Sequence, residues 1–217
     1  MLVSCLMPTL NRRRLIPMAL QCFLAQDWPE KELIVIDDGD DHVGDMFADI
    51  ADINYSWWAP RRTIGAKLNE GCKRAKGDIL VRWDDDDWSA PGRISDQVAR
   101  LLHSGKSVTG YHSLLFWDAA RSHGSKYSGS TNYALGTSLC FQRKYWKSNP
   151  FRECSTGEDN AFIRPAQAGK AIASVDAAQM MVARIHAHSV SKRTGPTSWP
   201  TINKAEFPPA FFEALGA

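Results

Sequence analysis

The first 105 residues alternate between uninterrupted apolar runs and segments with apolar residues at helical spacing. Residues 2–8 and 33–36 are apolar runs that end in a proline and in acidic residues, as buried strands commonly do. Between them, residues 15–26 have the periodicity of an amphipathic helix, with Pro17 in its first turn. This strand–helix–strand order, with strands that lack polar alternation, predicts a parallel sheet covered on both faces.

The same unit follows once more along the chain. Residues 63–77 have the pattern of a helix with a closing glycine, and residues 78–83 predict a strand that again ends in acids. Residues 89–105 predict a further helix, with Ser89 as its N-cap and a second closing glycine. The first half of the chain is therefore expected to be an α/β unit.

After residue 105 the pattern changes, because long helices no longer separate the strands. Three segments are typical of strands, namely residues 107–118, 137–146 and 178–188, and residues 157–169 are typical of a helix. We expect these strands to extend the same sheet, largely as antiparallel pieces. Residues 189–217 predict a flap and a short C-terminal helix, so the expected division is 1–105, 106–188 and 189–217.

Composition limits the class of protein. A chain of 217 residues with 44% hydrophobic and 23% charged residues supports one large packed domain. The net charge of +2 gives no reason to expect nucleic acid or an anionic membrane as a partner. The five cysteines lack metal-site spacing, which predicts reduced, mostly buried thiols. No apolar stretch reaches the length of a transmembrane segment, so we expect a soluble, cytoplasmic protein.

Acidic residues follow two of the predicted parallel strands where each strand ends. Asp37 and Asp38 follow residues 33–36, and Asp84 to Asp87 follow residues 78–83. The carboxyl ends of parallel strands meet at one edge of a sheet, where open α/β sheets bind ligands. Crowded carboxylates raise one another's pKa values or need a cation, and Mg²⁺ or Mn²⁺ prefers oxygen ligands and bridges phosphates. The pattern favours a metal–diphosphate site over a solvated acidic turn.

Six motifs in a fixed order carry a resemblance to a known family. They are PTLNR at 8–12, ELIVIDDGDD at 32–41, IGAKLNEGCKRAKGDILVRWDDDDWSAP at 64–91, GTSLCFQR at 136–143, GEDNAFI at 157–163 and RIHAH at 184–188. The set resembles the family 2 glycosyltransferases of the GT-A fold over residues 2–188. The resemblance implies a mostly parallel central sheet flanked by helices and extended by antiparallel strands. It also implies a nucleoside diphosphate sugar donor, Mn²⁺ or Mg²⁺, and inversion at the anomeric carbon.

The resemblance implies a division of labour along the chain. Residues 1–105 would bind the nucleotide sugar and residues 106–188 would form the acceptor side. Asp38 corresponds to the acid that hydrogen-bonds the base, usually uracil, although thymine and cytosine donors occur in the family. Leu68 stands where the family often has an arginine facing the diphosphate, so Lys67 or the N–H groups of residues 64–67 are the expected substitutes. The expected donor-binding residues are Pro8, Thr9, Asn11, Arg12, Asp38, Lys67, Asp84 and Asp85.

The DxD motif of the family corresponds to Asp84–Asp86. In that register Asp86 is the expected main metal ligand, Asp84 is a second ligand, and Asp87 has no assigned role. A histidine near the last strand can complete the metal shell in this fold. His186 is the expected residue and His188 the alternative, because alternate residues of a strand point to the same face.

The GED motif implies the catalytic group. By resemblance, Asp159 is the catalytic base and Glu158 lies beside it. The chemistry agrees, because inversion by direct displacement needs one base that takes the proton of the acceptor hydroxyl. Taken alone, the two acids would be explained by favourable charge at the N-terminus of a helix.

Other classes of function stay open from the sequence. A nucleotidyltransferase or phosphohydrolase would use a similar acidic metal site, although residues 8–14 lack the glycines of a typical nucleotidyltransferase phosphate loop. A catalytically inactive nucleotide-binding module is compatible with Leu68. The acceptor is unspecified, since a saccharide, lipid-linked sugar, protein or modified nucleic acid would fit. Residues 116–133 are predicted to be a mobile acceptor loop.

Overall fold

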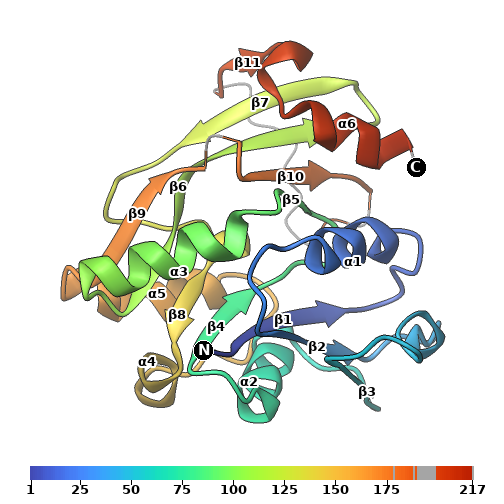
Figure 1. Cartoon of the computed structure of the whole chain (residues 1–217), viewed down its shortest axis with the longest axis vertical. Coiled ribbons are helices and arrows are strands. Elements are labelled where there is room, and N and C mark those ends of the chain that lie inside the picture. Colours follow the sequence, from blue (N-terminus) through green and yellow to red (C-terminus); the bar gives the residue numbers. More distant parts are fainter. Residues whose placement is uncertain (178, 188, 190–198, 217) are drawn as a thin grey trace.

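The computed structural model describes residues 1–177, 179–187, 189 and 199–216. Its first strands are β1 (Val3–Thr9), β2 (Lys31–Asp37), β3 (Ile53–Trp57), β4 (Ile79–Arg82) and β5 (Trp88–Ser89). The later strands are β6 (Val108–Asp118), β7 (His123–Ser128), β8 (Cys140–Gln142), β9 (Ile172–Asp176), β10 (Met181–Ile185) and β11 (Thr201–Ile202). Within the described residues they form one sheet, ordered β11-β7-β6-β8-β4-β1-β2-β3, to which β5, β9 and β10 are joined (Figure 1).

The helices flank this sheet. They are α1 (Ile16–Leu24), α2 (Ile64–Arg74), α3 (Arg93–Ser104), α4 (Arg143–Ser148), α5 (Glu158–Ala168) and α6 (Pro209–Gly216), with 3-10 turns η1 (Gly44–Met46), η2 (Gly136–Ser138) and η3 (Lys204–Glu206). β1 pairs in parallel with β2 and β4, and β2 pairs in parallel with β3. The predicted parallel sheet of the first half is confirmed. The edge strand β3 escaped prediction because its INYSW sequence is half-exposed and has no apolar run.

Alternate side chains of the strands point to opposite faces of the sheet and pack into separate clusters of the core. One cluster joins Val3, Cys5 and Met7 of β1 to α1, α3 and α6. A second joins Leu6 to α2, α4 and α5 across the other face of the sheet. A third lies around β6 and β10 and includes Phe116. The prediction of helices on both faces is confirmed, and Figure 1 shows α3 crossing in front of the sheet.

The second half extends the sheet with β6 at its centre. β6 pairs antiparallel with β7 and β8, as predicted, but parallel with β9 and β10. Two expectations are wrong here. Residues 137–146 give only the short strand β8 before the chain turns into α4, and much of 116–133 is the β6–β7 hairpin rather than a loop. The predicted C-terminal helix is present as α6, whose buried Phe211 packs edge-on against Trp88.

Two helix ends differ from prediction. α2 ends at Arg74, and Gly77 serves a close approach instead, because a Cβ there would lie 2.4 Å from the Leu2 carbonyl oxygen. Ser89 lies in β5 rather than capping α3, and its hydroxyl accepts a hydrogen bond from Arg93 at 2.9 Å. Gly105 ends α3 as predicted, in the left-handed conformation with φ 63°.

The thiols and the helix lengths can be compared with expectation. All five cysteines are free, and four of them are buried. Across the described part of the chain, no helix has both the length and the apolar character needed to cross a bilayer.

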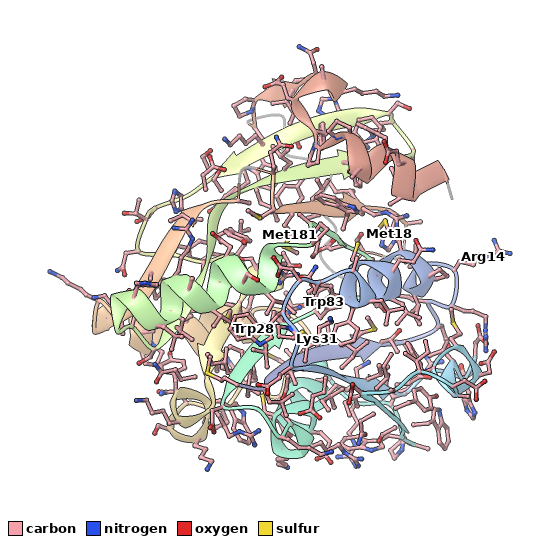
Figure 2. The ribbon with its side chains drawn as sticks, in the orientation of Figure 1. Arg14, Met18, Trp28, Lys31, Trp83 and Met181 are labelled. Atoms are coloured by element: carbon pink, nitrogen blue, oxygen red, sulfur yellow. The ribbon has the colours of Figure 1, made fainter. Side chains whose placement is uncertain are left out.

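Trp83 is almost fully buried at the centre of the molecule (Figure 2), beneath the guanidinium of Arg93 at 4.9 Å from its ring centre. The tryptophan beside the aspartate run is therefore part of the core.

Candidate active site

A cleft of about 640 Å³ opens at the carboxyl ends of β1 and β4. The loop before α5, the turn η2 and the end of β10 contribute its other walls. All of Asp84–Asp87 line it, as the sequence predicted for this edge of the sheet. Asp37 does not join them, because its carboxylate accepts hydrogen bonds from the Gly39 amide at 2.8 Å and the Tyr55 hydroxyl at 2.8 Å. Asp37 therefore shapes the loop after β2.

The four consecutive aspartates have different partners. Asp84 is paired with Arg82, whose Nε lies 2.8 Å from its Oδ1. Asp85 turns toward β1 and accepts hydrogen bonds from the Thr9 hydroxyl and from Arg12, both at 2.7 Å. Asp85 therefore binds residues of β1 and of the loop that follows it.

Asp86 and Asp87 meet the end of β10. Asp86 Oδ2 lies 2.9 Å from His186 Nε2, although the two residues are 100 positions apart. Asp87 accepts a hydrogen bond from the Arg184 amide at 3.0 Å and another from the Thr137 hydroxyl. The alternative histidine, His188, lies outside the described residues. His186, the histidine expected from the sequence, thus lies beside Asp86, the expected main metal ligand.

Three of the carboxylates form a donor set that fits a divalent ion. One oxygen each from Asp84, Asp86 and Asp87 lie within 4.8 Å of one another. Mg²⁺ and Mn²⁺ favour carboxylate oxygens, and such ions usually keep water or substrate phosphate in their remaining positions. Asp87, which the sequence left unassigned, belongs to this set, whereas Asp85 does not.

Burial and mutual repulsion shift the pKa values of the carboxyl groups in the cluster. Burial, with the neighbouring Asp85 charge, raises the pKa of Asp86 to about 7. Burial, with the charges of Asp86 and Asp84, raises the pKa of Asp87 to about 8. Burial alone would raise the pKa of Asp84, but the Arg82 guanidinium outweighs it and holds that pKa below the usual value. Carboxylates with raised pKa values gain most from a cation that compensates their charge.

The two acids at the start of α5 occupy different environments. Glu158 is buried and pairs with Arg82 at 3.0 Å. Asp159 lines the cleft, where its Oδ1 accepts a hydrogen bond from the Asn160 amide at 2.7 Å. Its carboxylate lies against Gly136 so closely that a Cβ on that glycine would be 2.1 Å from Asp159 Oδ2. Both acids line the cleft, and Asp159 is the more exposed of the two.

The donor-side residues form a tight hydrogen-bonded group beneath the cleft. Asp38 accepts hydrogen bonds from Lys67 Nζ and from the Arg62 amide, both at 2.6 Å. Lys67 also donates to the Thr9 carbonyl at 2.8 Å, and its side chain is buried. Asn11 Oδ1 accepts from the amide of Asp40 at 2.7 Å. Lys67 lines the cleft, but its ammonium is paired with the buried carboxylate of Asp38.

The first turn of α2 does not match the expectation of a phosphate site. The amides of Ile64 and Gly65 donate to Ser155 Oγ at 3.3 Å and to the Cys154 carbonyl at 3.1 Å. The next two amides donate to the side chain and carbonyl of Thr63. Because all four donors already have protein partners, this helix end offers no vacant N–H group to an anion.

A family model matches the part of the chain that holds the aspartate run. The model for glycosyl transferase family 2 matches residues 4–152 of the chain. The chain belongs to glycosyl transferase family 2. The matched residues include most of β1, β2 to β4 and Asp84–Asp87, whereas Asp159 and His186 lie outside them.

Curated relatives carry glycosyl transferase names. WcaA of Escherichia coli (strain K12), named for colanic acid biosynthesis, is 28% identical over 158 residues, covering 68% of this chain and 53% of WcaA. EpsE of Bacillus subtilis (strain 168), named as a glycosyltransferase, is 31% identical over 121 residues, covering 52% of this chain and 44% of EpsE. The chain thus spans about half the length of these two relatives.

Solved structures share the fold at low sequence identity. S. aureus TarS 1-349 with UDP-GlcNAc has a TM-score of 0.72 and 18% identity, covering 88% of this chain and 61% of TarS. A complex of the same TarS region with UDP has a TM-score of 0.70 and 20% identity, covering 85% of this chain and 61% of TarS. The mannosyltransferase PcManGT from Pyrobaculum calidifontis was solved with GDP-Man and Mn²⁺. It has a TM-score of 0.64 and 18% identity, covering 80% of this chain and 54% of PcManGT. The GT-A fold of this family member is therefore established.

Sequence reasoning missed Arg82, which connects the two acidic motifs of this family 2 chain. Its guanidinium contacts Asp84 at 2.8 Å and Glu158 at 3.0 Å, across 76 positions of sequence. The available signal was a cationic residue at the end of an apolar strand, separated from the aspartate run by Trp83 alone. Buried charges are paired in folded proteins, so Arg82 required two nearby acids.

Proposed function

We propose that this protein is a metal-dependent, inverting glycosyltransferase. It would move a sugar from a nucleoside diphosphate sugar to an acceptor hydroxyl, and UDP-linked sugars are the first donors to test. The observation that carries the proposal is the presence of the Asp84, Asp86 and Asp87 oxygens and of Asp159 in one cleft. Family membership supports the reaction class, since the matched region includes the strand and the aspartates.

We propose Asp84, Asp86 and His186 as the residues that hold Mn²⁺ or Mg²⁺, with Asp87 as a further oxygen donor. The position of His186 beside Asp86 and the three-carboxylate set support this assignment. When bound, such an ion stabilises negative charge on the departing diphosphate, so that no protein acid is needed there. PcManGT, which shares the fold, was solved with GDP-Man and Mn²⁺, and this supports Mn²⁺ as the first ion to test.

We propose Asp159 as the catalytic base. Glu158 is a poor candidate, because its carboxylate is buried and neutralised by Arg82. Asp159 faces the cleft and can reach an acceptor hydroxyl there. In direct displacement, the base takes the hydroxyl proton as the oxygen attacks the anomeric carbon opposite the leaving diphosphate. Glu158 and Arg82 would position the start of α5 rather than touch substrate.

The contact of Asp159 with Gly136 gives a prediction. Gly136→Ala should lower kcat about tenfold to 100-fold, because the new Cβ displaces the Asp159 carboxylate and small misplacements of a catalytic group are costly. UDP and Mn²⁺ affinities should stay within about twofold of the parent values, because the three atoms nearest the new Cβ all belong to Asp159 and none to the aspartate cluster. Gly169→Ala is the matched control, since its Cβ would meet nothing nearer than the Pro165 carbonyl oxygen at 3.4 Å. Equal kcat values for parent and Gly136→Ala would contradict the placement of the base.

For the donor, we propose that Asp38 accepts the imide N–H of uracil. Lys67 and the Arg62 amide orient its carboxylate, and a carboxylate has lone pairs beyond those two bonds. The UDP and UDP-GlcNAc complexes of TarS support a uridine nucleotide in this fold. Pro8, Thr9, Asn11 and Arg12 would form the loop beside the nucleotide, with Asp85 held near the ribose by Thr9.

A donor panel tests the proposed function. The protein is incubated with UDP-, GDP-, CDP- and dTDP-sugars and Mn²⁺, and release of the nucleoside diphosphate is measured. Slow hydrolysis of a UDP-sugar is expected without any acceptor, and EDTA should abolish it. Release of pyrophosphate from a nucleoside triphosphate would instead indicate a nucleotidyltransferase. Calorimetric binding of UDP without turnover of any donor, under conditions that include diverse saccharide acceptors, would indicate an inactive binding module.

A further inference from the structure

Arg12 donates a hydrogen bond to Asp86, one of the proposed metal ligands. Its Nη1 donates to Asp85 Oδ1 at 2.7 Å and to Asp86 Oδ2 at 3.1 Å. The same Asp86 oxygen lies 2.9 Å from His186 Nε2. In the protein without metal, a guanidinium and an imidazole therefore share the oxygen that a divalent ion would need.

The charge distribution explains this arrangement. Asp84 has Arg82 as its cation, and Asp87 has the Thr137 hydroxyl and the Arg184 amide as donors. Asp85 and Asp86 share Arg12, and their side chains are only 1% and 12% exposed. Breaking a buried ion pair by removing one partner is costly, so a cation at this place stabilises the cluster in the absence of metal.

Arg12 is also suited to a different partner. Its side chain lines the cleft and keeps 14% of its surface exposed. A guanidinium binds phosphate oxygens through a planar fork of donors, at least as well as it binds carboxylates. A diphosphate that enters the cleft can thus accept hydrogen bonds from Arg12 in place of Asp86. Because the α2 amides are filled and Lys67 is buried against Asp38, Arg12 is well placed for this exchange.

We propose that Arg12 is an internal counter-ion that makes metal binding depend on the donor diphosphate. The inference rests on the proposed function, and it adds a coupling between the binding of the metal and the binding of the diphosphate. An ion that arrives alone competes with Arg12 for Asp86 and meets a positive charge beside its site. The diphosphate draws Arg12 away and frees Asp86, so metal and diphosphate raise each other's affinity by the same factor.

The test measures Mn²⁺ affinity by electron paramagnetic resonance of the free ion, with and without saturating UDP. In the parent protein, UDP should tighten Mn²⁺ binding at least tenfold. In Arg12→Gln, Mn²⁺ alone should bind at least threefold more tightly, and the tightening by UDP should shrink at least threefold. A purely structural role predicts the opposite sign, because a damaged cluster binds Mn²⁺ more weakly. Weaker or unchanged binding of Mn²⁺ alone in Arg12→Gln overturns the proposal.

Two further variants make the result specific. Arg14→Gln removes the same charge from an exposed position two residues away, which points outward at the edge of the molecule (Figure 2). It should leave both affinities within twofold of the parent values. Arg12→Lys keeps a cation but loses the planar fork, so Mn²⁺ alone should bind as in the parent while the tightening by UDP decreases. If Arg12→Gln does not fold, an unchanged effect of UDP in Arg12→Lys overturns the proposal.

The inference and the proposed function fail in different ways. A parent protein that binds neither Mn²⁺ nor UDP contradicts the proposed function itself. A parent protein that binds both, with an Arg12→Gln variant that is indistinguishable from it, contradicts only the role of Arg12.

Discussion

Asp159→Asn is expected to lower kcat for sugar transfer by about 100-fold to 10,000-fold, the usual contribution of a general base. The amide keeps the size of the carboxylate but cannot take the proton of the acceptor hydroxyl. Binding of Mn²⁺ and UDP should be unchanged, because Asp159 belongs to the α5 side of the cleft and not to the aspartate cluster. The measurements are kcat with the donor found in the panel and UDP affinity by calorimetry.

The control for this variant is Glu153→Gln. Glu153 is an exposed acid in the segment before α5, so its substitution changes the same charge without altering the cleft lining. It should retain the parent kcat. Full turnover in Asp159→Asn would show that another group is the base, and loss of UDP binding would show that the variant disturbs the donor site.

Asp86→Ala is expected to weaken Mn²⁺ binding in the presence of UDP by at least about 100-fold, equivalent to roughly 2.7 kcal/mol. The substitution removes one of the three clustered oxygens and also the carboxylate beside His186. Metal-dependent donor binding should be lost with it. Mn²⁺ titration with saturating UDP gives the affinity, and EDTA-treated parent protein gives the baseline.

Comparison within the aspartate run makes this prediction specific. Asp85→Ala should reduce Mn²⁺ affinity less than Asp86→Ala, because Asp85 points to Thr9 and Arg12. The exposed Asp49→Ala should have no effect beyond the small change in net charge. Equal losses for alanine at each of the four consecutive aspartates would reject the assignment of Asp86 as the main ligand.

The edge of the sheet that holds the site could be predicted from sequence because it depends on short-range pattern. Apolar runs that end in acids identify strands, and parallel pairing brings their ends together. The approach of His186 to Asp86 was expected from the order of motifs, and the structure gives it as 2.9 Å. Local pattern and family order were sufficient for these features.

Other features depend on contacts between distant segments, which no local pattern encodes. The filling of the α2 amides requires the segment at Cys154 and Ser155 to pack against that helix. The close contact of Gly136 with Asp159 likewise joins η2 to α5. Residues 116–133 were expected to form a mobile loop on the acceptor side, yet pairing with β6 makes part of them a strand. Tertiary pairing overrode the local preference there.

The division of the core into clusters has a consequence for how related chains could diverge. Asp159 begins a helix whose Phe162 and Ile163 are anchored in the second cluster, behind the sheet. Phe116 and Leu135 line the cleft but belong to the third cluster. Substitutions in the third cluster can thus reshape one wall of the cleft while α5 stays packed against the second cluster. If the proposed function holds, this separation would let new specificities arise without rebuilding the chemistry.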